Sequence, residues 1–407
     1  ASSLLNPDQS RQTSAATLYE FRPQGREDTS VLDIGSLIPE DYTMTKTEPP
    51  ILLTPGPLTT SDATRRAMLR DWGSRDDDFI EMNRRVRARL VELAGGQGTH
   101  VCVPVQGSGT FAVEAAVGTL VPRAGKALIL VNGAYGVRIS RMCDALGRAY
   151  VTVETPEDEP PTADEVDRVL AADADIGHVI AVHCETTSGI LNPIADIAAA
   201  VAGRGRGLII DAMSSFGALP LDLDAVPAIA IVSSANKCLE GVPGMAFAIV
   251  REDVLTEAEG NAPGLSLDLY DQWRVLEGNG QWRFTPPTHV IAALDAALAQ
   301  HEAEGGVEGR GARYCRNCEV LVGGMTDMGF RPFLPEDLQA PIIVTFHTPA
   351  DPKFSFEQFY ELLRGRGIVI YPGKLTRTDS FRIGCIGALD ESHMQRALDA
   401  IGAVLGE

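Results

Sequence analysis

The sequence predicts an α/β protein built on a mainly parallel β-sheet that helices cover on both faces. Between residues 90 and 250, short apolar runs of strand length alternate with amphipathic segments of helix length. The strand candidates are continuously apolar, which is typical of parallel strands that are buried on both faces. Such sheets bind their ligands at the carboxyl ends of the strands, so we expect functional side chains at those positions.

The predicted elements follow one another along the chain. The strand candidates are residues 127–131, 178–183, 208–211, 228–232 and 245–250. The helices expected among them are residues 110–120, 134–146, 162–171 and 194–202. We therefore expect a large domain over residues 49–290.

After about residue 290 the pattern changes to that of a smaller α+β unit. The helices expected there are residues 290–304, 311–328, 355–364 and 392–405. The strands expected there are residues 342–347, 367–371 and 380–384. This unit is the predicted small C-terminal domain, residues 291–407.

Residues 1–48 are polar and show no sustained periodicity. We expect an extension that is flexible or lies along another surface. Met44 stands just before the globular pattern begins, so a translation start there remains an open alternative.

Composition restricts the classes of partner. The formal net charge of −20 argues against nucleic acid and against anionic membranes, because both need a basic footprint. No apolar run approaches membrane-spanning length. The seven cysteines show no disulfide-framework spacing, which predicts a reducing, cytoplasmic compartment. Cys315 and Cys318 form the one close pair, and without a second pair we interpret them as structural or incidental and expect no metal site.

Lys237 is the first candidate for chemistry. It follows the apolar run 228–232 and precedes the glycine turn 241–244. Burial there would lower the pKa of its amine and leave a nucleophile suited to forming a Schiff base. The alternative is an ordinary loop lysine.

The segment 106–110, with the sequence QGSGT, follows a strand-like stretch and opens the predicted helix 110–120. Glycines and a hydroxyl at a helix N-terminus favour a phosphate, because free N–H groups and the helix dipole both attract an anion. The segment matches neither a Walker A sequence nor a dinucleotide fingerprint. The alternative is a plain turn with a serine cap.

Three further strand ends carry polar or aromatic groups. Asp211 ends one apolar run, where a carboxylate would grip a cofactor ring or simply cap the next turn. Residues 185–189 follow the strand that ends at His183, and Tyr135 follows the strand that ends at Val131. Together, the five strand ends offer a phosphate cradle, an aromatic ring, hydroxyls, an acid and a lysine. Pyridoxal 5′-phosphate needs each of these groups, so the sequence predicts a site for it.

Segments at these strand ends and elsewhere carry a family resemblance. They are residues 53–59, 106–110, 183–187, 211–217, 233–237, 265–270, 282–289, 371–374 and 381–384. On these segments, the chain resembles the fold-type I aminotransferases of the alanine–glyoxylate and serine–pyruvate group. The resemblance covers the chain from residue 51 to about 405. Residues 265–270 and 282–289 favour the branch of that group that acts on phosphonates.

The resemblance implies a fold and a reaction. The fold is that of the fold-type I pyridoxal-phosphate-dependent transferases, with a large-domain sheet of the seven-stranded type and a smaller α+β domain. The reaction is a ping-pong transamination in phosphonate catabolism, in which 2-aminoethylphosphonate donates its amino group to pyruvate. The products are phosphonoacetaldehyde and alanine. The resemblance also implies a homodimer.

The resemblance further implies roles for individual residues. Lys237 would form the Schiff base and move the proton between substrate and cofactor, and Asp211 would pair with the ring nitrogen. Tyr135 would stack on the ring where many relatives use tryptophan. The other cofactor-binding residues implied are Ser108, Gly109, Thr110, Thr186, Thr187 and Asn236.

Two implied roles lie outside the strand ends. Thr285 would reach the cofactor phosphate of the partner subunit; its alternative is a turn residue before two prolines. Arg382 would bind the acidic group of the substrate, because its planar fork suits an oxyanion. Its alternative is a surface salt bridge.

Alternatives for the function stay open on sequence grounds. One is an alanine–glyoxylate or serine–pyruvate type aminotransferase, or a carbon–sulfur lyase on the same fold. The other is a non-catalytic protein that binds pyridoxal phosphate or serves as an interaction partner. The residues alone do not distinguish phosphonate from carboxylate at Arg382.

Overall fold

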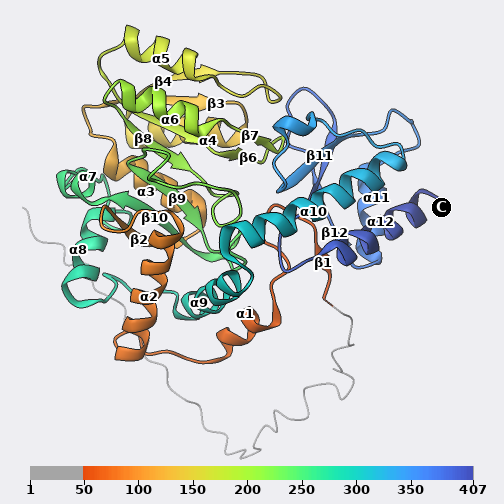
Figure 1. Ribbon diagram of the computed structural model, residues 1–407, viewed down its shortest axis with the longest axis horizontal. Helices are drawn as coiled ribbons and strands as arrows, with labels where there is room; N and C mark the ends of the chain where they lie inside the picture. The colour runs from red at the N-terminus through yellow and green to blue at the C-terminus, as the bar shows by residue number, and fades with distance from the viewer. Residues whose placement is uncertain (1–48, 407) are drawn as a thin grey trace, which may run out of the picture. The chain divides into compact units, whose positions relative to one another are not determined.

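A seven-stranded β-sheet forms the centre of the computed structural model, which describes residues 49–406 (Figure 1). Its strand order is β2-β10-β9-β8-β5-β3-β4. The strands are β2 (His100–Gly107), β3 (Lys126–Val131), β4 (Ala149–Glu154), β5 (Ile176–Val182), β8 (Gly207–Asp211), β9 (Ala230–Ser234) and β10 (Gly244–Arg251). In this sheet β10 is antiparallel to both neighbours, and the other pairings are parallel. The predicted mainly parallel sheet is confirmed.

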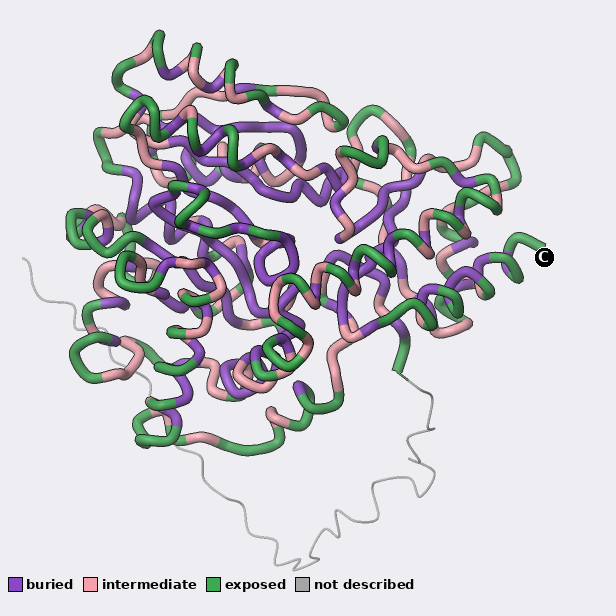
Figure 2. The backbone as a smooth tube through the Cα atoms, viewed as in Figure 1, coloured by how far each residue is buried: buried purple, intermediate pink, exposed green. Residues whose placement is uncertain are grey.

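Helices cover both faces of this sheet. One face packs against α2 (Asp77–Leu93), α5 (Ala163–Ala172), α6 (Ile194–Gly203) and α9 (Thr288–Ala303). The other face packs against α3 (Gly109–Leu120), α4 (Ala134–Leu146), α7 (Glu252–Glu257) and α8 (Leu269–Asn279). Successive strand residues such as Leu128 and Ile129 enter opposite cores, which explains why the inner strands are apolar throughout. Figure 2 shows these strands buried, in purple, inside the exposed outer helices.

A second, smaller sheet lies toward the C-terminus. Its three strands are ordered β11-β14-β13 and comprise β11 (Ile343–His347), β13 (Tyr371–Pro372) and β14 (Ser380–Gly384). Helices α10 (Gly306–Asp327), α11 (Phe356–Gly365) and α12 (Glu391–Leu405) supply the rest of a core in which several phenylalanines surround Phe381. The predicted domain boundary between residues 290 and 291 falls inside α9, and the division into two domains stays a prediction.

Shorter elements connect these parts. Strand β1 (Ile51–Leu52) pairs in parallel with β12 (Ile368–Val369), which brings the start of the described chain against its C-terminal third. Helix α1 (Asp62–Arg66) is capped by Ser61, whose side chain accepts a hydrogen bond from the N–H of Thr64. Strands β6 (Cys184–Glu185) and β7 (Ile190–Leu191) form a small hairpin directly after β5.

Several elements were not anticipated from the sequence, and three of them are large enough to matter for the fold. Strand β4 lies at the edge of the large sheet, and its partly exposed residues give it no apolar run. Helix α2 is amphipathic but densely charged, and α8 begins inside segment 265–270, to which the sequence analysis assigned no secondary structure. Helix α10 begins at Gly306, ahead of the expected residue 311, because its packing against α9 and α12 overrides three glycines in its first turns.

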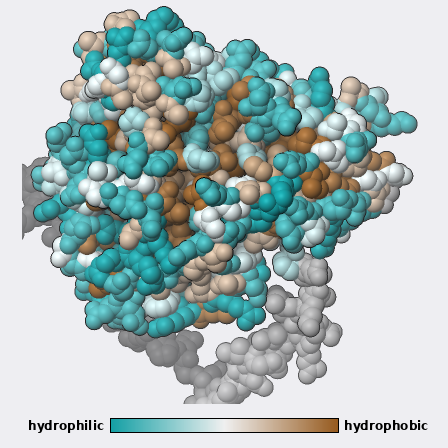
Figure 3. All heavy atoms as spheres, in the orientation of Figure 1, coloured by the Kyte–Doolittle hydropathy of each residue, from teal (hydrophilic) through white to brown (hydrophobic). Residues whose placement is uncertain are grey.

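The surface fits the acidic composition. On the face drawn in Figure 3, the outer parts are largely hydrophilic and the hydrophobic residues gather toward the middle. Within residues 49–406, no helix has the length and apolar character needed to cross a membrane. The predicted extension of residues 1–48, including Met44, lies outside the described residues.

Candidate active site

The carboxyl ends of five strands of the large sheet, β2, β9, β8, β5 and β3, open onto one cavity of about 180 Å³. The predicted site residues that line it are Ser108, Gly109, Thr110, Tyr135, Thr186, Asp211, Asn236 and Lys237. These residues come from the segments after β2, β3, β5 and β9 and from the last position of β8. The parallel topology therefore brings together groups that are up to 129 positions apart in the sequence, as the span from Ser108 to Lys237 shows.

Lys237 is held with its amine inside this cavity. Its Nζ donates a hydrogen bond to the carbonyl oxygen of Pro55. The neighbouring Gly56 has a φ of +116°, and a Cβ there would lie 2.9 Å from Nζ. Burial lowers the pKa of the Lys237 amine, although the nearby tyrosine and acidic groups partly oppose this effect. The sequence analysis expected burial to lower this pKa, and the surroundings of Lys237 act in that direction. A lower pKa favours the neutral, nucleophilic amine.

Asp211 ends β8 and is almost completely buried, with 6% of its surface exposed. Its Oδ1 accepts a hydrogen bond of 3.0 Å from the N–H of Met213. Burial raises the pKa of this carboxyl to about 6, because the single N–H donor and the charges of Arg138 and Lys237 compensate only part of the desolvation. A cationic group bound in the cavity would favour the ionised form of this buried carboxyl.

The predicted phosphate cradle lies at the N-terminus of α3. Ser108 is the N-cap residue, yet its side chain makes no cap hydrogen bond to its own helix. A Cβ on Gly109 would lie 2.2 Å from Met213 Sδ, so the Met213 side chain packs directly against this glycine and would have to move to admit a larger residue. The hydroxyl and the helix N-terminus are thus arranged to receive an anion.

Arg138 is a lining residue that sequence reasoning missed. Its Nη1 donates a 3.3 Å hydrogen bond to Thr110 Oγ1, so its charge stands beside the cradle. Its guanidinium carbon also lies 4.7 Å from the ring centroid of Tyr135. The available signal was its position three residues after Tyr135, on the same face of the helix.

The ring of Tyr135 lines the cavity near the amine. Burial raises the pKa of Tyr135, but a hydrogen bond with the Thr186 side chain and the charges of Lys237 and Lys374 outweigh it, and the pKa is lowered. Lys374 Nζ donates a 3.4 Å hydrogen bond to the tyrosine hydroxyl. Tyr135 therefore offers the cavity both an aromatic face and a phenol hydroxyl of lowered pKa.

Thr187 lies outside the cavity lining. Its hydroxyl donates a 2.6 Å hydrogen bond to Glu185 Oε1 and accepts one of 2.8 Å from the N–H of Ala134. Glu185, which is completely buried, also accepts hydrogen bonds from the N–H groups of Tyr135 and Gly136. Thr187 and Glu185 thus fix the start of α4, and with it Tyr135.

Two predicted site residues, Arg382 and Thr285, are not among the residues that line the cavity. Arg382 lies on β14, where its Nε donates to Pro372 O at 3.0 Å and its Nη1 donates to Thr186 O at 2.8 Å. It is 2% exposed and reaches the cavity wall through Thr186, which argues against the surface salt bridge. Thr285 is exposed beside Phe284, away from the cavity lining of its own chain.

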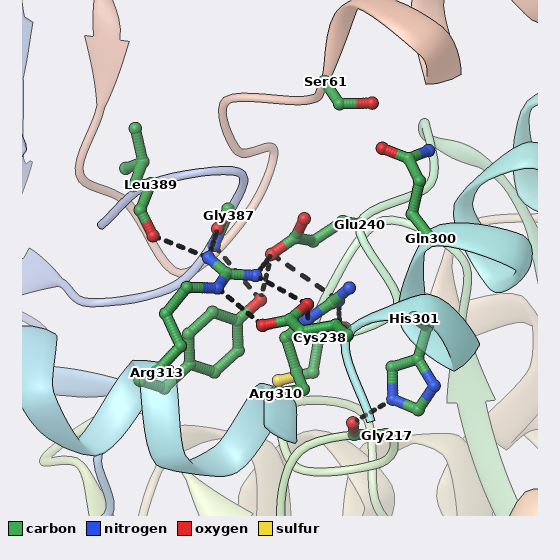
Figure 4. A network of polar contacts seen from close by, with 12 residues as sticks. Ser61, Gly217, Cys238, Glu240, Gln300, His301, Arg310, Arg313, Gly387 and Leu389 are labelled. Atoms are coloured by element: carbon green, nitrogen blue, oxygen red, sulfur yellow. Dashed lines mark hydrogen bonds and ion pairs between the residues drawn. The ribbon is translucent and has the colours of Figure 1, made fainter. Parts of the chain in front are cut away.

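A buried polar network supports the turn that carries the lysine (Figure 4). Glu240, three residues after Lys237, accepts hydrogen bonds from Arg313 at 2.7 Å and from the Tyr314 hydroxyl at 2.6 Å. Arg310 donates to the carbonyl oxygen of Cys238 and pairs with Glu304 at 2.6 Å. The charges lie on α10 and on the loop beside it, so this helix anchors the lysine turn.

The residues present fit pyridoxal 5′-phosphate. The hydroxyl of Ser234, which lines the cavity, is buried without a hydrogen-bond partner, so a polar ligand group is needed there. The N-terminus of α3 suits an anion, a cation would stabilise the Asp211 carboxylate, and the amine of Lys237 has a lowered pKa. A phosphate, a protonated ring nitrogen and an aldehyde supply these three complements.

Comparison with known proteins agrees with the geometry. Residues 64–379 match the family described as aminotransferase class-V. The 2-aminoethylphosphonate–pyruvate transaminase of Pseudomonas aeruginosa is 56% identical over 358 residues, which cover 88% of this chain and 96% of that protein. The protein of the same name from Pseudomonas fluorescens is 55% identical over 361 residues, covering 89% and 98%.

Solved structures show the same fold. The alanine–glyoxylate aminotransferase of a Nostoc species has a TM-score of 0.82 at 22% identity, covering 88% of this chain and 95% of that one. The pyridoxamine–pyruvate aminotransferase of Mesorhizobium loti has a TM-score of 0.79 at 26% identity, covering 88% and 92%. The predicted family resemblance is confirmed: this chain belongs to the aminotransferase class-V family.

Proposed function

We propose that this protein transfers the amino group of 2-aminoethylphosphonate to pyruvate, releasing phosphonoacetaldehyde and alanine, with pyridoxal 5′-phosphate as cofactor. The observation that carries this proposal is the meeting of Lys237, Asp211 and the α3 cradle in one cavity. The identity of more than half to transaminases of that name supports the choice of substrates.

The residues divide the work according to their surroundings. The α3 N-terminus, with Ser108 and Thr110, would hold the cofactor phosphate, and Asp211 would hold its ring nitrogen protonated. Tyr135 would lie against the ring. When bound, the cofactor supplies an electron sink for the carbanion that forms when the substrate loses a proton. Lys237, with its lowered pKa, would take that proton from the substrate carbon and return it at the next stage.

Arg382 would orient both substrates. Two backbone carbonyls already fix its guanidinium, so its remaining N–H groups can meet an oxyanion without loss of side-chain freedom. Phosphonate and carboxylate each offer paired oxygens to that fork. One arginine would therefore serve the phosphonate donor in one half-reaction and pyruvate in the other.

A donor screen tests the proposal. Purified holoenzyme is supplied with pyruvate and a panel of amines, and alanine is followed. We expect alanine from 2-aminoethylphosphonate and little from serine or other amino acids, and we expect Lys237→Ala to abolish both the reaction and the visible absorbance of the lysine-bound aldehyde. Turnover of serine with none of the phosphonate would overturn the substrate assignment. Undiminished activity of Lys237→Ala would overturn the mechanism and favour a non-catalytic role.

We also propose a homodimer in which Thr285 reaches the partner's cofactor phosphate. Phe111 and Phe284 are about half exposed, at 49% and 51%, and line one surface depression together with Trp282. An apolar depression beside the exposed Thr285 is the kind of surface that a partner subunit covers. Light scattering should give twice the chain mass of 43.5 kDa, and Phe284→Asp should shift it toward a single chain.

We propose the cytoplasm as the compartment. All seven cysteines are free of disulfide bonds in the structure, and six of them are buried. Thiol labelling of the unfolded native protein, without reductant, should modify every cysteine.

A further inference from the structure

Lys374 contacts Tyr135, which lines the cavity, and within residues 49–406 it pairs with no acidic side chain. Its Nζ lies 3.4 Å from the hydroxyl of Tyr135 and 4.9 Å from the ring centroid. The side chain is exposed, and within residues 49–406 it forms no ion pair with a carboxylate. Its positive charge is close enough to lower the pKa of both Tyr135 and Lys237. An unpaired cation is thus held within electrostatic reach of the reacting amine.

Contacts at both ends of its segment fix this position. The segment connects β13 to β14, and the N–H of Gly373 donates a 2.9 Å hydrogen bond to Ser380 O. Further along, the N–H of Thr376 donates to both carboxylate oxygens of Glu157, at 3.1 Å each. Glu157 lies in the loop after β4 of the large sheet, so the β13–β14 connection is anchored to that loop.

Lys374 and Arg382 approach the same pair of residues. Tyr371, at the start of the connection, is the register partner of Arg382 across β13 and β14. Arg382 donates to the carbonyl oxygen of Thr186, and the Thr186 side chain bonds Tyr135, to which Lys374 donates. The two cations therefore flank Thr186 and Tyr135 from one connected piece of backbone.

A second cation beside Arg382 would distinguish substrates by the charge of their acidic group. A carboxylate carries one negative charge near neutral pH, whereas a phosphonate has a second ionisable proton, as a phosphate monoester does, and approaches two negative charges as pH rises. The fork of Arg382 balances one charge. An ammonium on a flexible stem can follow the third phosphonate oxygen, which a carboxylate lacks.

We propose that Lys374 is a specificity-determining residue that binds the phosphonate dianion together with Arg382 and so favours phosphonate over carboxylate donors. This inference rests on the proposed function. It separates the two acidic groups by charge: Arg382 serves both substrates, and Lys374 serves the phosphonate.

Two unreactive inhibitors isolate this effect. Ethylphosphonate and propionate lack the amine, so each competes through its acidic group alone. Lys374→Gln should raise the inhibition constant of ethylphosphonate about tenfold, equivalent to ~1.4 kcal/mol, and change that of propionate by less than about twofold. In the wild-type enzyme, the preference for ethylphosphonate should grow as pH rises from 6 to 8, and Lys374→Gln should abolish that growth.

Two control variants sharpen the test. Lys353→Gln removes another exposed lysine of the C-terminal region and should leave both constants unchanged. Lys374→Arg should keep most of the preference, because it keeps the charge. Equal changes in the two inhibition constants, or none, would overturn the role of Lys374. A wild-type enzyme that turns over no 2-aminoethylphosphonate would instead overturn the proposed function.

Discussion

Arg313 Nη2 lies 2.7 Å from Glu240 Oε1, and this contact ties helix α10 to the turn that carries Lys237. The N–H of Glu240 closes that turn by donating to Lys237 O at 2.8 Å, and Glu240 adopts a φ of +58°. Arg313 also donates to the carbonyl oxygens of Gly387 and Leu389, both at 2.6 Å. One side chain thus bridges the lysine turn and the loop after β14.

We expect Glu240→Gln to destabilise the protein strongly. The substitution leaves the buried Arg310 and the partly buried Arg313 with one carboxylate fewer, and an uncompensated buried charge costs about 3–5 kcal/mol. Because Glu304 still pairs with both arginines, the free energy of unfolding should fall by about 3 kcal/mol. Urea unfolding measures the loss. The matched control is Glu361→Gln, whose partner Arg364 is exposed, and it should cost less than about 1 kcal/mol. Equal losses in the two variants would contradict this account.

Gly56 should be needed for the position of the Lys237 amine. Gly56→Ala places a Cβ 2.9 Å from both Nζ and Cδ of Lys237, at a φ of +116°. Gly98→Ala is the control, since Gly98 has a φ of +78° with no atom within 4 Å of its Cβ position. Both variants place an L-residue at a positive φ, which costs on the order of 1–3 kcal/mol. Only Gly56→Ala should slow the rise of cofactor absorbance on reconstitution of the apo-protein. Comparable reconstitution rates in the two variants would contradict this role of Gly56.

The site residues at the strand ends were predictable, because an apolar run of strand length precedes each of them in the sequence. Asp211 and Lys237 each follow an apolar run, so topology alone brought them together. Arg138 was not predictable in this way, because its role depends on which face of α4 meets Thr110. Strand β4 was missed because an edge strand needs no apolar run. The partner of Glu240 lies 73 positions away, and only the packing of α10 reveals it.

Asp211 gives the apo-protein a pH-dependent stability. Burial raises its pKa from 3.8 to about 6, so the folded state favours the protonated carboxyl. A raised carboxyl pKa contributes stability that is fully present below pH 3.8 and is lost as pH rises through about 6. Asp211→Asn removes this loss. Its free energy of unfolding relative to wild type should therefore increase by about 2 kcal/mol between pH 4.5 and 7.5.

The measurement is urea unfolding of both apo-proteins across that pH range. Asp222→Asn, at an exposed aspartate, serves as the control and should show no such trend. A constant difference between Asp211→Asn and wild type would mean that the buried carboxyl keeps an ordinary pKa. In the holoenzyme the sign should reverse, because a protonated ring nitrogen would then compensate the ionised carboxylate.

Arg382→Lys should impair both half-reactions while the cofactor stays bound. Lysine keeps the positive charge but loses the planar fork and the donors to Pro372 O and Thr186 O. Loss of charge-assisted hydrogen bonds worth about 1.5–3 kcal/mol should lower kcat/KM roughly a hundredfold for 2-aminoethylphosphonate and for pyruvate alike. Single-turnover absorbance changes measure each half-reaction separately. Arg377→Lys, at an exposed position in the same β13–β14 connection, should leave both rates unchanged. A loss of rate confined to the phosphonate half-reaction would assign Arg382 the selective role argued for Lys374. A loss of cofactor absorbance would instead make Arg382 a structural residue of the cavity wall.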